Sequence, residues 1–196
     1  HWLYQTKSNP NQAWVVGSKK KLEVLANCSS LKWRNSYLPS LDVEDRLDKY
    51  TFNRVKEIID EHHPKMMFIN LKGPDFWGHG ANWEMYRYGI FQTDSMLNAL
   101  YNIIETDTVY KGKTTLIMSN DHGRHLEGIQ NGYINHGDRC IGCTHINFYA
   151  FGPDFKSNVV TGHQREQVDI APTVAQLMGY KMFQVEGKVM DELFKD

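Results

Sequence analysis

The sequence has little of the features that would place it in a specialised class of protein. Only 3 of its 196 residues are cysteine and 6 are proline, so neither a disulfide-stapled scaffold nor a proline-rich disordered chain is indicated. Its longest apolar runs, such as 116–118 and 146–151, are far shorter than the roughly 20 residues that span a bilayer. What remains is a globular chain that is long enough to bury a core.

An excess of charge of one sign is also missing. The 22 Lys and Arg residues balance 23 Asp and Glu residues, which leaves a net charge of -1. A nucleic-acid binder is expected to be basic, so this balance argues against a nucleic-acid partner. It also gives no reason to expect docking on an anionic membrane by charge.

Aromatic residues and histidine are abundant. The 9 Phe, 10 Tyr and 5 Trp residues argue against disorder. Nine histidines are many for this length, and they are either scattered through surface and core or gathered in a metal site. Their positions in the chain have to decide between the two interpretations.

Hydrophobic periodicity predicts an alternation of strands and helices. We expect strands at 12–16, 65–71, 114–118 and 146–151, and helices at 42–62, after Asn82 and from Asp169. The apolar run 65–71 is typical of a strand that is buried on both faces. The alternation predicts an α/β fold, a mostly parallel sheet with helices on both faces. Because no repeat or charge block marks a boundary, we expect a single domain over residues 1–196.

Polar side chains that can bind metal follow the predicted strands. Asp75 and His79 come after the strand at 65–71, and Asp121 and His122 come after the strand at 114–118. His136 lies in the loop that leads to the next strand. Ligands of open α/β sheets bind at the carboxyl ends of the strands, and carboxylate oxygens and imidazole nitrogens are ordinary zinc ligands. Each pair alone is common by chance, but their succession predicts a metal site.

These residues lie within motifs that resemble a known family. The motifs are Gly73-Pro-Asp-Phe-Trp-Gly-His-Gly80, Met118-Ser-Asn-Asp-His-Gly123, His136-Gly137 leading to 148–153, the stretch 167–180, and 186–190. Together they resemble the alkaline phosphatase superfamily, which includes nucleotide pyrophosphatase/phosphodiesterases, sulfatases and cofactor-independent phosphoglycerate mutases. The resemblance covers residues 65–196 well and the preceding part poorly.

The resemblance implies a site with two divalent metal ions. Asp75, His79 and His136 would bind one ion, and Asp121 and His122 would bind the other. Zinc suits this mixed donor set best, and manganese is the alternative. His145 is the rival of His136 as the third ligand of the first ion, and we prefer His136 because it lies beside a glycine in a loop.

One part of the family's pattern is not found. The resemblance calls for an earlier strand that ends in an Asp, followed by a nucleophilic Thr, Ser or modified Cys at a helix start. Asp42 and Asp45 are interpreted as helix-capping residues instead. We therefore expect this chain to be the C-terminal portion of such a domain, lacking the nucleophile and inactive by itself, with the missing N-terminal part as its partner.

The resemblance implies a metal-dependent hydrolase of small phosphate esters, and we favour a diester over a monoester. Three alternatives stay open: a sulfatase, a phosphoglycerate-mutase-like phosphotransferase, and a non-catalytic relative that binds metal for stability. The nucleophile segment discriminates between the catalytic and the non-catalytic alternatives.

Other residues that carry chemistry have simpler interpretations. Cys140 and Cys143 form a CxxC pair, which we interpret as a structural feature of its loop rather than a redox site. Arg124 and His125 follow the Asp-His-Gly motif, and we expect a solvated pair at a strand end. The run 19–21 is predicted to be a solvated lysine turn.

Overall fold

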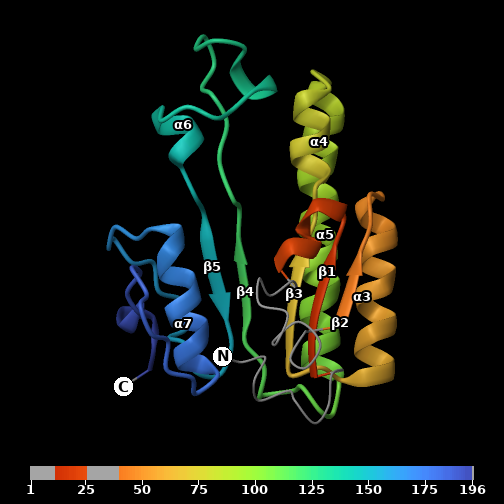
Figure 1. The fold of residues 1–196 in the computed structure, drawn as a ribbon, viewed down its shortest axis with the longest axis vertical. Coiled ribbons are helices and arrows are strands. Elements are labelled where there is room, and N and C mark those ends of the chain that lie inside the picture. Colours follow the sequence, from red (N-terminus) through yellow and green to blue (C-terminus); the bar gives the residue numbers. More distant parts are fainter. Residues whose placement is uncertain (1–11, 26–39, 196) are drawn as a thin grey trace. The chain divides into compact units, whose positions relative to one another are not determined.

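A computed structural model describes residues 12–25 and 40–195 of the chain (Figure 1). The chain divides into two compact units, His1–Leu97 and Asn98–Asp196. Residues 26–39, which include Cys28, lie outside the described residues.

The N-terminal unit is built on a parallel sheet. Its strands are β1 (Ala13–Gly17), β2 (Ser40–Val43) and β3 (Met66–Asn70), in the order β2-β1-β3. β1 is the central strand and pairs with both neighbours in parallel register. Its residues Ala13, Val15 and Val16 are buried. The predicted α/β class, with a parallel sheet flanked by helices, is confirmed (Figure 1).

Helix α3 (Asp48–His62) packs against β1 and ends where the sequence predicts. Phe52, Val55 and Ile59 recur at helical spacing and are buried. The predicted start at Asp42 is wrong, because Asp42 lies in β2. The error has a physical reason: the carboxylate of Asp42 pairs with two arginine side chains instead of capping backbone N–H groups.

The environment of β3 also differs from the prediction. A strand buried on both faces was expected, but Phe68 is 43% exposed and the other residues of β3 are half-buried. In the three-stranded sheet β3 pairs with β1 and lies at the edge. An apolar run therefore overstates the burial of an edge strand.

Two helices follow β3. Residues 73–79 form helix α4 (Gly73–His79), in which Pro74 occupies the first turn. Helix α5 (Trp83–Thr106) begins after Asn82, as predicted. The side chain of Asn82 accepts a hydrogen bond of 3.0 Å from the amide of Met85, which caps this start.

The C-terminal unit contains an antiparallel strand pair. β4 (Leu116–Ser119) and β5 (Phe148–Phe151) both form where strands are predicted, but they run in opposite directions. Helix α6 (Ile141–Thr144) lies before β5, and helix α7 (Ile170–Leu177) follows it. Gly179 ends α7 with a positive φ of 71°, which agrees with the predicted glycine at this helix end.

Short 3₁₀ helices complete the secondary structure. They are η2 (Lys20–Leu25), η3 (Gly132–Ile134), η4 (Gln167–Asp169) and η5 (Asp191–Leu193). Within 12–25 and 40–195, no helix has both the length and the apolar character that a membrane span requires.

Candidate metal centre

Helix α4 brings the first predicted ligand pair together. Asp75 and His79 are one helical turn apart, and Asp75 Oδ1 lies 3.3 Å from His79 Nε2. The other carboxylate oxygen, Oδ2, lies 2.8 Å from Lys19 Nζ. The Asp75 carboxylate thus contacts the imidazole of His79 through one oxygen and the ammonium group of Lys19 through the other.

Lys19 is a site residue that the sequence did not reveal. A solvated turn was predicted for 19–21, but the Lys19 side chain is largely covered and pairs with Asp75. The available signal was its place directly after β1, at the carboxyl end of a parallel strand. Lys19 and Asp75 line a cleft of about 480 Å³ together with Lys72, Phe76, Trp77, His79, Gly80 and Asn82.

A buried carboxylate fixes the start of α4. Asp48 is 4% exposed and accepts hydrogen bonds from the backbone amides of Lys72 at 2.9 Å and Gly73 at 2.6 Å. A Cβ atom at Gly73 would lie 2.6 Å from Asp48 Oδ2, so only glycine fits there. These bonds set the position of the helix that carries Asp75 and His79.

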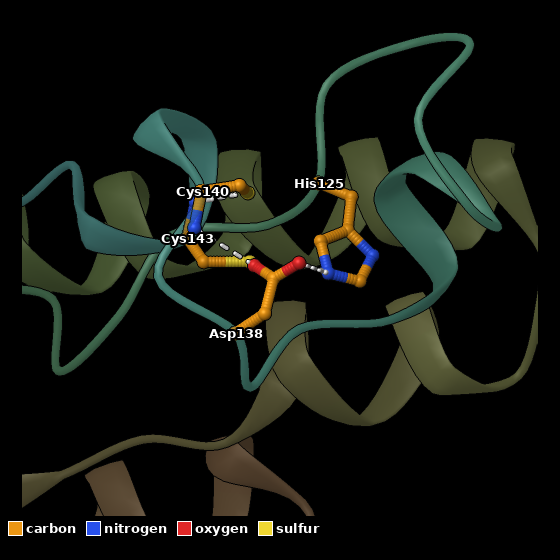
Figure 2. A group of neighbouring side chains, drawn as sticks. All are labelled: His125, Asp138, Cys140 and Cys143. Carbon is orange, nitrogen blue, oxygen red and sulfur yellow. Dashed lines mark hydrogen bonds and ion pairs between the residues drawn. The ribbon is translucent and has the colours of Figure 1, made fainter.

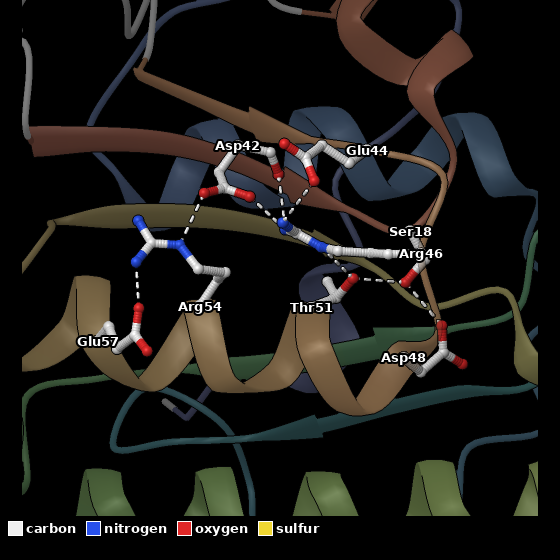
Figure 3. Close-up of polar contacts among 8 residues, drawn as sticks. All are labelled: Ser18, Asp42, Glu44, Arg46, Asp48, Thr51, Arg54 and Glu57. Atoms are coloured by element: carbon white, nitrogen blue, oxygen red, sulfur yellow. Dashed lines mark hydrogen bonds and ion pairs between the residues drawn. The ribbon is translucent and has the colours of Figure 1, made fainter.

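Ser18 is fully buried beside the same carboxylate. Its Oγ donates a 2.6 Å hydrogen bond to Asp48 and lies 2.8 Å from the hydroxyl of Thr51 (Figure 3). A serine nucleophile needs a base or a metal beside an accessible oxygen. The hydroxyl that directly follows β1 therefore has a structural role.

A second, partly exposed group of charges links β2 to α3. Figure 3 shows Asp42 between the guanidinium groups of Arg46 and Arg54, with Glu57 paired to Arg54 from the far side. Burial acts to raise the pKa of Asp42, but hydrogen bonds from Arg54 and Arg46 outweigh it and lower the pKa below its ordinary value. Asp42 is thus charged at neutral pH and stabilises the junction of strand and helix.

The C-terminal unit contains the other predicted ligands. Asp121 and His122 follow β4 directly, and His122 Nε2 lies 3.6 Å from Asp121 Oδ1. Asp121 is 65% exposed, while His122 is half-buried. The Nδ1 atom of His122 lies 2.9 Å from the carbonyl oxygen of Gly123. If Nδ1 carries the proton it donates to that oxygen, and Nε2 is then left as the atom that accepts a metal ion.

His136, which the sequence assigns to the first ion together with Asp75 and His79, lies beside His122. Its ring stacks on that of His122, with the centroids 3.6 Å apart and an angle of 18° between the planes. Its rival His145 is exposed at the end of α6, where its carbonyl oxygen accepts a hydrogen bond from Asn120. Which of the two histidines completes the ligand set of the first ion stays a prediction.

The structure thus brings the predicted ligands together in two groups. Asp75 and His79 meet in the N-terminal unit, and Asp121, His122 and His136 meet in the C-terminal unit. Both groups combine carboxylate with imidazole, the donor set that suits zinc or manganese. That all five residues serve one two-metal site stays a prediction.

A further group of metal-binding side chains lies in the C-terminal unit. Figure 2 shows the Asp138 carboxylate between the ring of His125 and the sulfur of Cys143, with Cys140 close by. The predicted solvated role of His125 is wrong, because its side chain is only 2% exposed. The amide of His125 donates a 3.2 Å hydrogen bond to the carbonyl oxygen of Asn135, which holds residue 125 against the loop that contains Asn135.

The electrostatics of this group favour a structural over a redox role. Hydrogen bonds from Cys140 lower the pKa of Asp138 to about 2. Burial and a hydrogen bond with Cys140 raise the pKa of the Cys143 thiol. A redox CxxC pair needs a thiol whose pKa is lowered, so the predicted structural role of this pair is supported.

Comparison with models of protein families identifies a match. A family model described as the Metalloenzyme superfamily matches residues 32–182, which is more than half of the chain. No curated protein matches the chain. The matched range contains all five predicted metal ligands.

Proposed function

The chain belongs to the Metalloenzyme superfamily, a member of the alkaline phosphatase superfamily clan, and from this premise we propose that it is the metal-binding portion of a phosphodiesterase. Membership makes it a relative of metal-dependent phosphoesterases and mutases. The observation that carries the finer proposal is a carboxylate–imidazole pair in each unit, Asp75 with His79 and Asp121 with His122.

We assign the ligands as the sequence predicts. Asp75, His79 and His136 bind one divalent ion, and Asp121 and His122 contribute to the second. Zinc is the first choice and manganese the alternative. When bound, such a pair of ions stabilises the attacking and the leaving oxygen of an in-line displacement at phosphorus.

The protein's own residues position these ligands. Asp48 holds the first turn of α4 through the amides of Lys72 and Gly73, and Lys19 holds the second oxygen of Asp75. Lys19 and Lys72 also line the cleft beside Asp75, where two cations attract an anionic ester. The substrate we propose is therefore a small phosphate diester that binds at this cleft.

Metal content tests the ligand assignment. D75A and H79A are each expected to weaken binding of a divalent ion by more than roughly 100-fold. Removing a residue that only hydrogen-bonds to a metal ligand already weakens binding by about 10- to 100-fold, and these variants remove a ligand itself. Elemental analysis after equilibrium dialysis against zinc or manganese measures this loss. H63A, a histidine at the end of α3 and outside the cleft, is the matched control. Unchanged metal content in D75A and H79A would overturn the assignment.

Turnover tests the reaction class. We expect a protein of residues 1–196 to bind metal without hydrolysing bis-p-nitrophenyl phosphate, since we identify no nucleophile among its described residues. The same chain together with the sequence that precedes it in its gene is expected to cleave the diester faster than p-nitrophenyl phosphate or p-nitrophenyl sulfate. Faster cleavage of the sulfate would instead identify a sulfatase, and no turnover in the longer chain would identify a non-catalytic relative.

A further inference from the structure

The group formed by His125, Asp138, Cys140 and Cys143, here termed the Cys cluster, is not among the ligands assigned above. We propose that the Cys cluster binds one structural zinc ion, separate from the ions of the proposed active site. The proposal does not depend on the phosphodiesterase activity, because it rests on residues that take no part in that site.

The four side chains are placed as zinc ligands are. One potential ligand atom from each residue lies within 4.8 Å of all the others. His125 Nε2 and Asp138 Oδ2 are 3.3 Å apart, and two ligand atoms each about 2.1 Å from a tetrahedral zinc ion lie roughly 3.4 Å apart. Modest contraction of the sulfur positions completes the site.

The donor types select zinc. Cys140 and Cys143 have the CxxC spacing that is common in structural zinc sites, and His and Asp supply the other two ligands. Two thiolates are soft donors, which disfavour magnesium and calcium. Both thiol protons leave to the buffer when the ion binds, since only the thiolate is a zinc ligand.

His125 is an independent sign that a ligand belongs here. Both of its ring nitrogens are buried, and neither makes a hydrogen bond with residues 12–25 or 40–195; Nε2 has only the ion-pair contact with Asp138. A buried polar atom without a partner destabilises the folded state. Because Nε2 faces the Asp138 carboxylate, an ion bound between the two groups gives that nitrogen the partner it lacks.

The backbone around the Cys cluster is built for close approach. The amide of Gly123 donates a 2.8 Å hydrogen bond to the carbonyl oxygen of Cys143. A Cβ atom at Gly142 would lie 2.3 Å from the carbonyl oxygen of Arg124, so the CxxC turn contacts the strand end directly. These contacts hold the cysteines beside His125 before any ion binds, which lowers the entropic cost of binding.

Zinc release by a mercurial reagent tests the proposal directly. The full chain is purified with a reductant, freed of loose metal by dialysis and titrated with p-hydroxymercuribenzoate in the presence of a zinc-sensitive dye. We expect the mercurial to release one zinc ion per chain, because it displaces only metal that is held by thiolate. C143S is expected to abolish this release, and C28S, the remaining cysteine, is the matched control.

Cobalt substitution does not depend on the folding of a variant. Cobalt(II) in the unaltered chain is expected to show a thiolate-to-cobalt charge-transfer band in the near ultraviolet and the strong visible bands of tetrahedral coordination. H125A is expected to weaken cobalt affinity by more than tenfold while keeping the charge-transfer band. Octahedral spectra without thiolate bands would overturn the proposal.

Two further outcomes distinguish this zinc site from the proposed active site and from a disulfide. D75A and H79A are expected to leave the mercurial-released zinc unchanged, so a failure of the proposed active site does not affect this result. A Cys140–Cys143 disulfide in the freshly purified chain, found by thiol counting and mass, would overturn the zinc site in favour of a disulfide staple.

Discussion

The carboxylates of the N-terminal unit and the Cys cluster of the C-terminal unit are surrounded in different ways. In the N-terminal unit each buried or half-buried carboxylate faces cations or donors: Asp42 faces two arginines, Asp75 faces Lys19, and Asp48 accepts backbone amides and a hydroxyl. In the C-terminal unit the Cys cluster brings carboxylate, imidazole and two sulfur atoms together. The first arrangement is balanced by the protein's own side chains, while the second calls for an added positive ion.

The largest expected effect of breaking this balance is at Asp48. D48A removes the acceptor of two backbone amides and of Ser18, and it is expected to lower the free energy of unfolding by about 3 kcal/mol. Urea denaturation followed by circular dichroism measures the change. D60A, an exposed acid on the same helix, is the control, with an expected change within about 0.5 kcal/mol. Equal effects of the two variants would show that Asp48 does not hold α4.

In the C-terminal unit the corresponding change is at Gly142. G142A forces a Cβ atom against the carbonyl oxygen of Arg124 and is expected to cost about 2 kcal/mol of stability. Hydrogen exchange over residues 123–145 is expected to rise as the CxxC turn moves away from His125. G162A has no heavy atom within 4 Å of the new Cβ and serves as the control. Unchanged exchange in G142A would contradict the close contact.

The smallest expected effect is the pH dependence at Asp42. Its pKa is lowered in the folded state, so its stabilisation is fully present above its unfolded pKa of about 3.9 and is lost as the pH falls through the folded value. We expect the free energy of unfolding to fall as the pH is lowered from 5 to 2 on account of this group. D42N is expected to remove this part of the pH dependence, which urea denaturation at several pH values measures. If the unfolding free energy of D42N depended on pH as that of the unaltered protein does, Asp42 would not contribute to the pH dependence.

The fold could be predicted from the sequence where periodicity is strong and local. Leu47, Val55 and Ile58 indicate α3 by their spacing, and the capping role of Asn82 marks the start of α5. The start of α3 could not be predicted, because an Asp before a helix caps the backbone or pairs with arginine, and only the folded chain decides. Strand direction in the pair β4 and β5 depends on contacts that are distant in sequence.

The candidate ligands, too, could be named from local sequence patterns, whereas contacts between residues distant in sequence could not. Asp75, His79, Asp121, His122 and His136 lie in local motifs after strands, so their spacing carries the signal. Lys19 meets Asp75 across 56 positions in sequence, and no local pattern links them. His125 was missed because a histidine beside an arginine is typical of a solvated strand end, whereas its burial comes from the loop that covers it.

The strand order β2-β1-β3 has a consequence for the way in which the chain acquires its structure. The central strand is the first in sequence, and it waits for a partner that follows 53 positions later, since Ala13 pairs with Met66. Parallel pairing of such high contact order is slow compared with helix formation. During synthesis α3 is therefore expected to form before the sheet is complete, and one edge of β1 remains unpaired until β3 has left the ribosome. Chaperone binding to nascent chains that end between residues 25 and 65 is the expected trace of that interval.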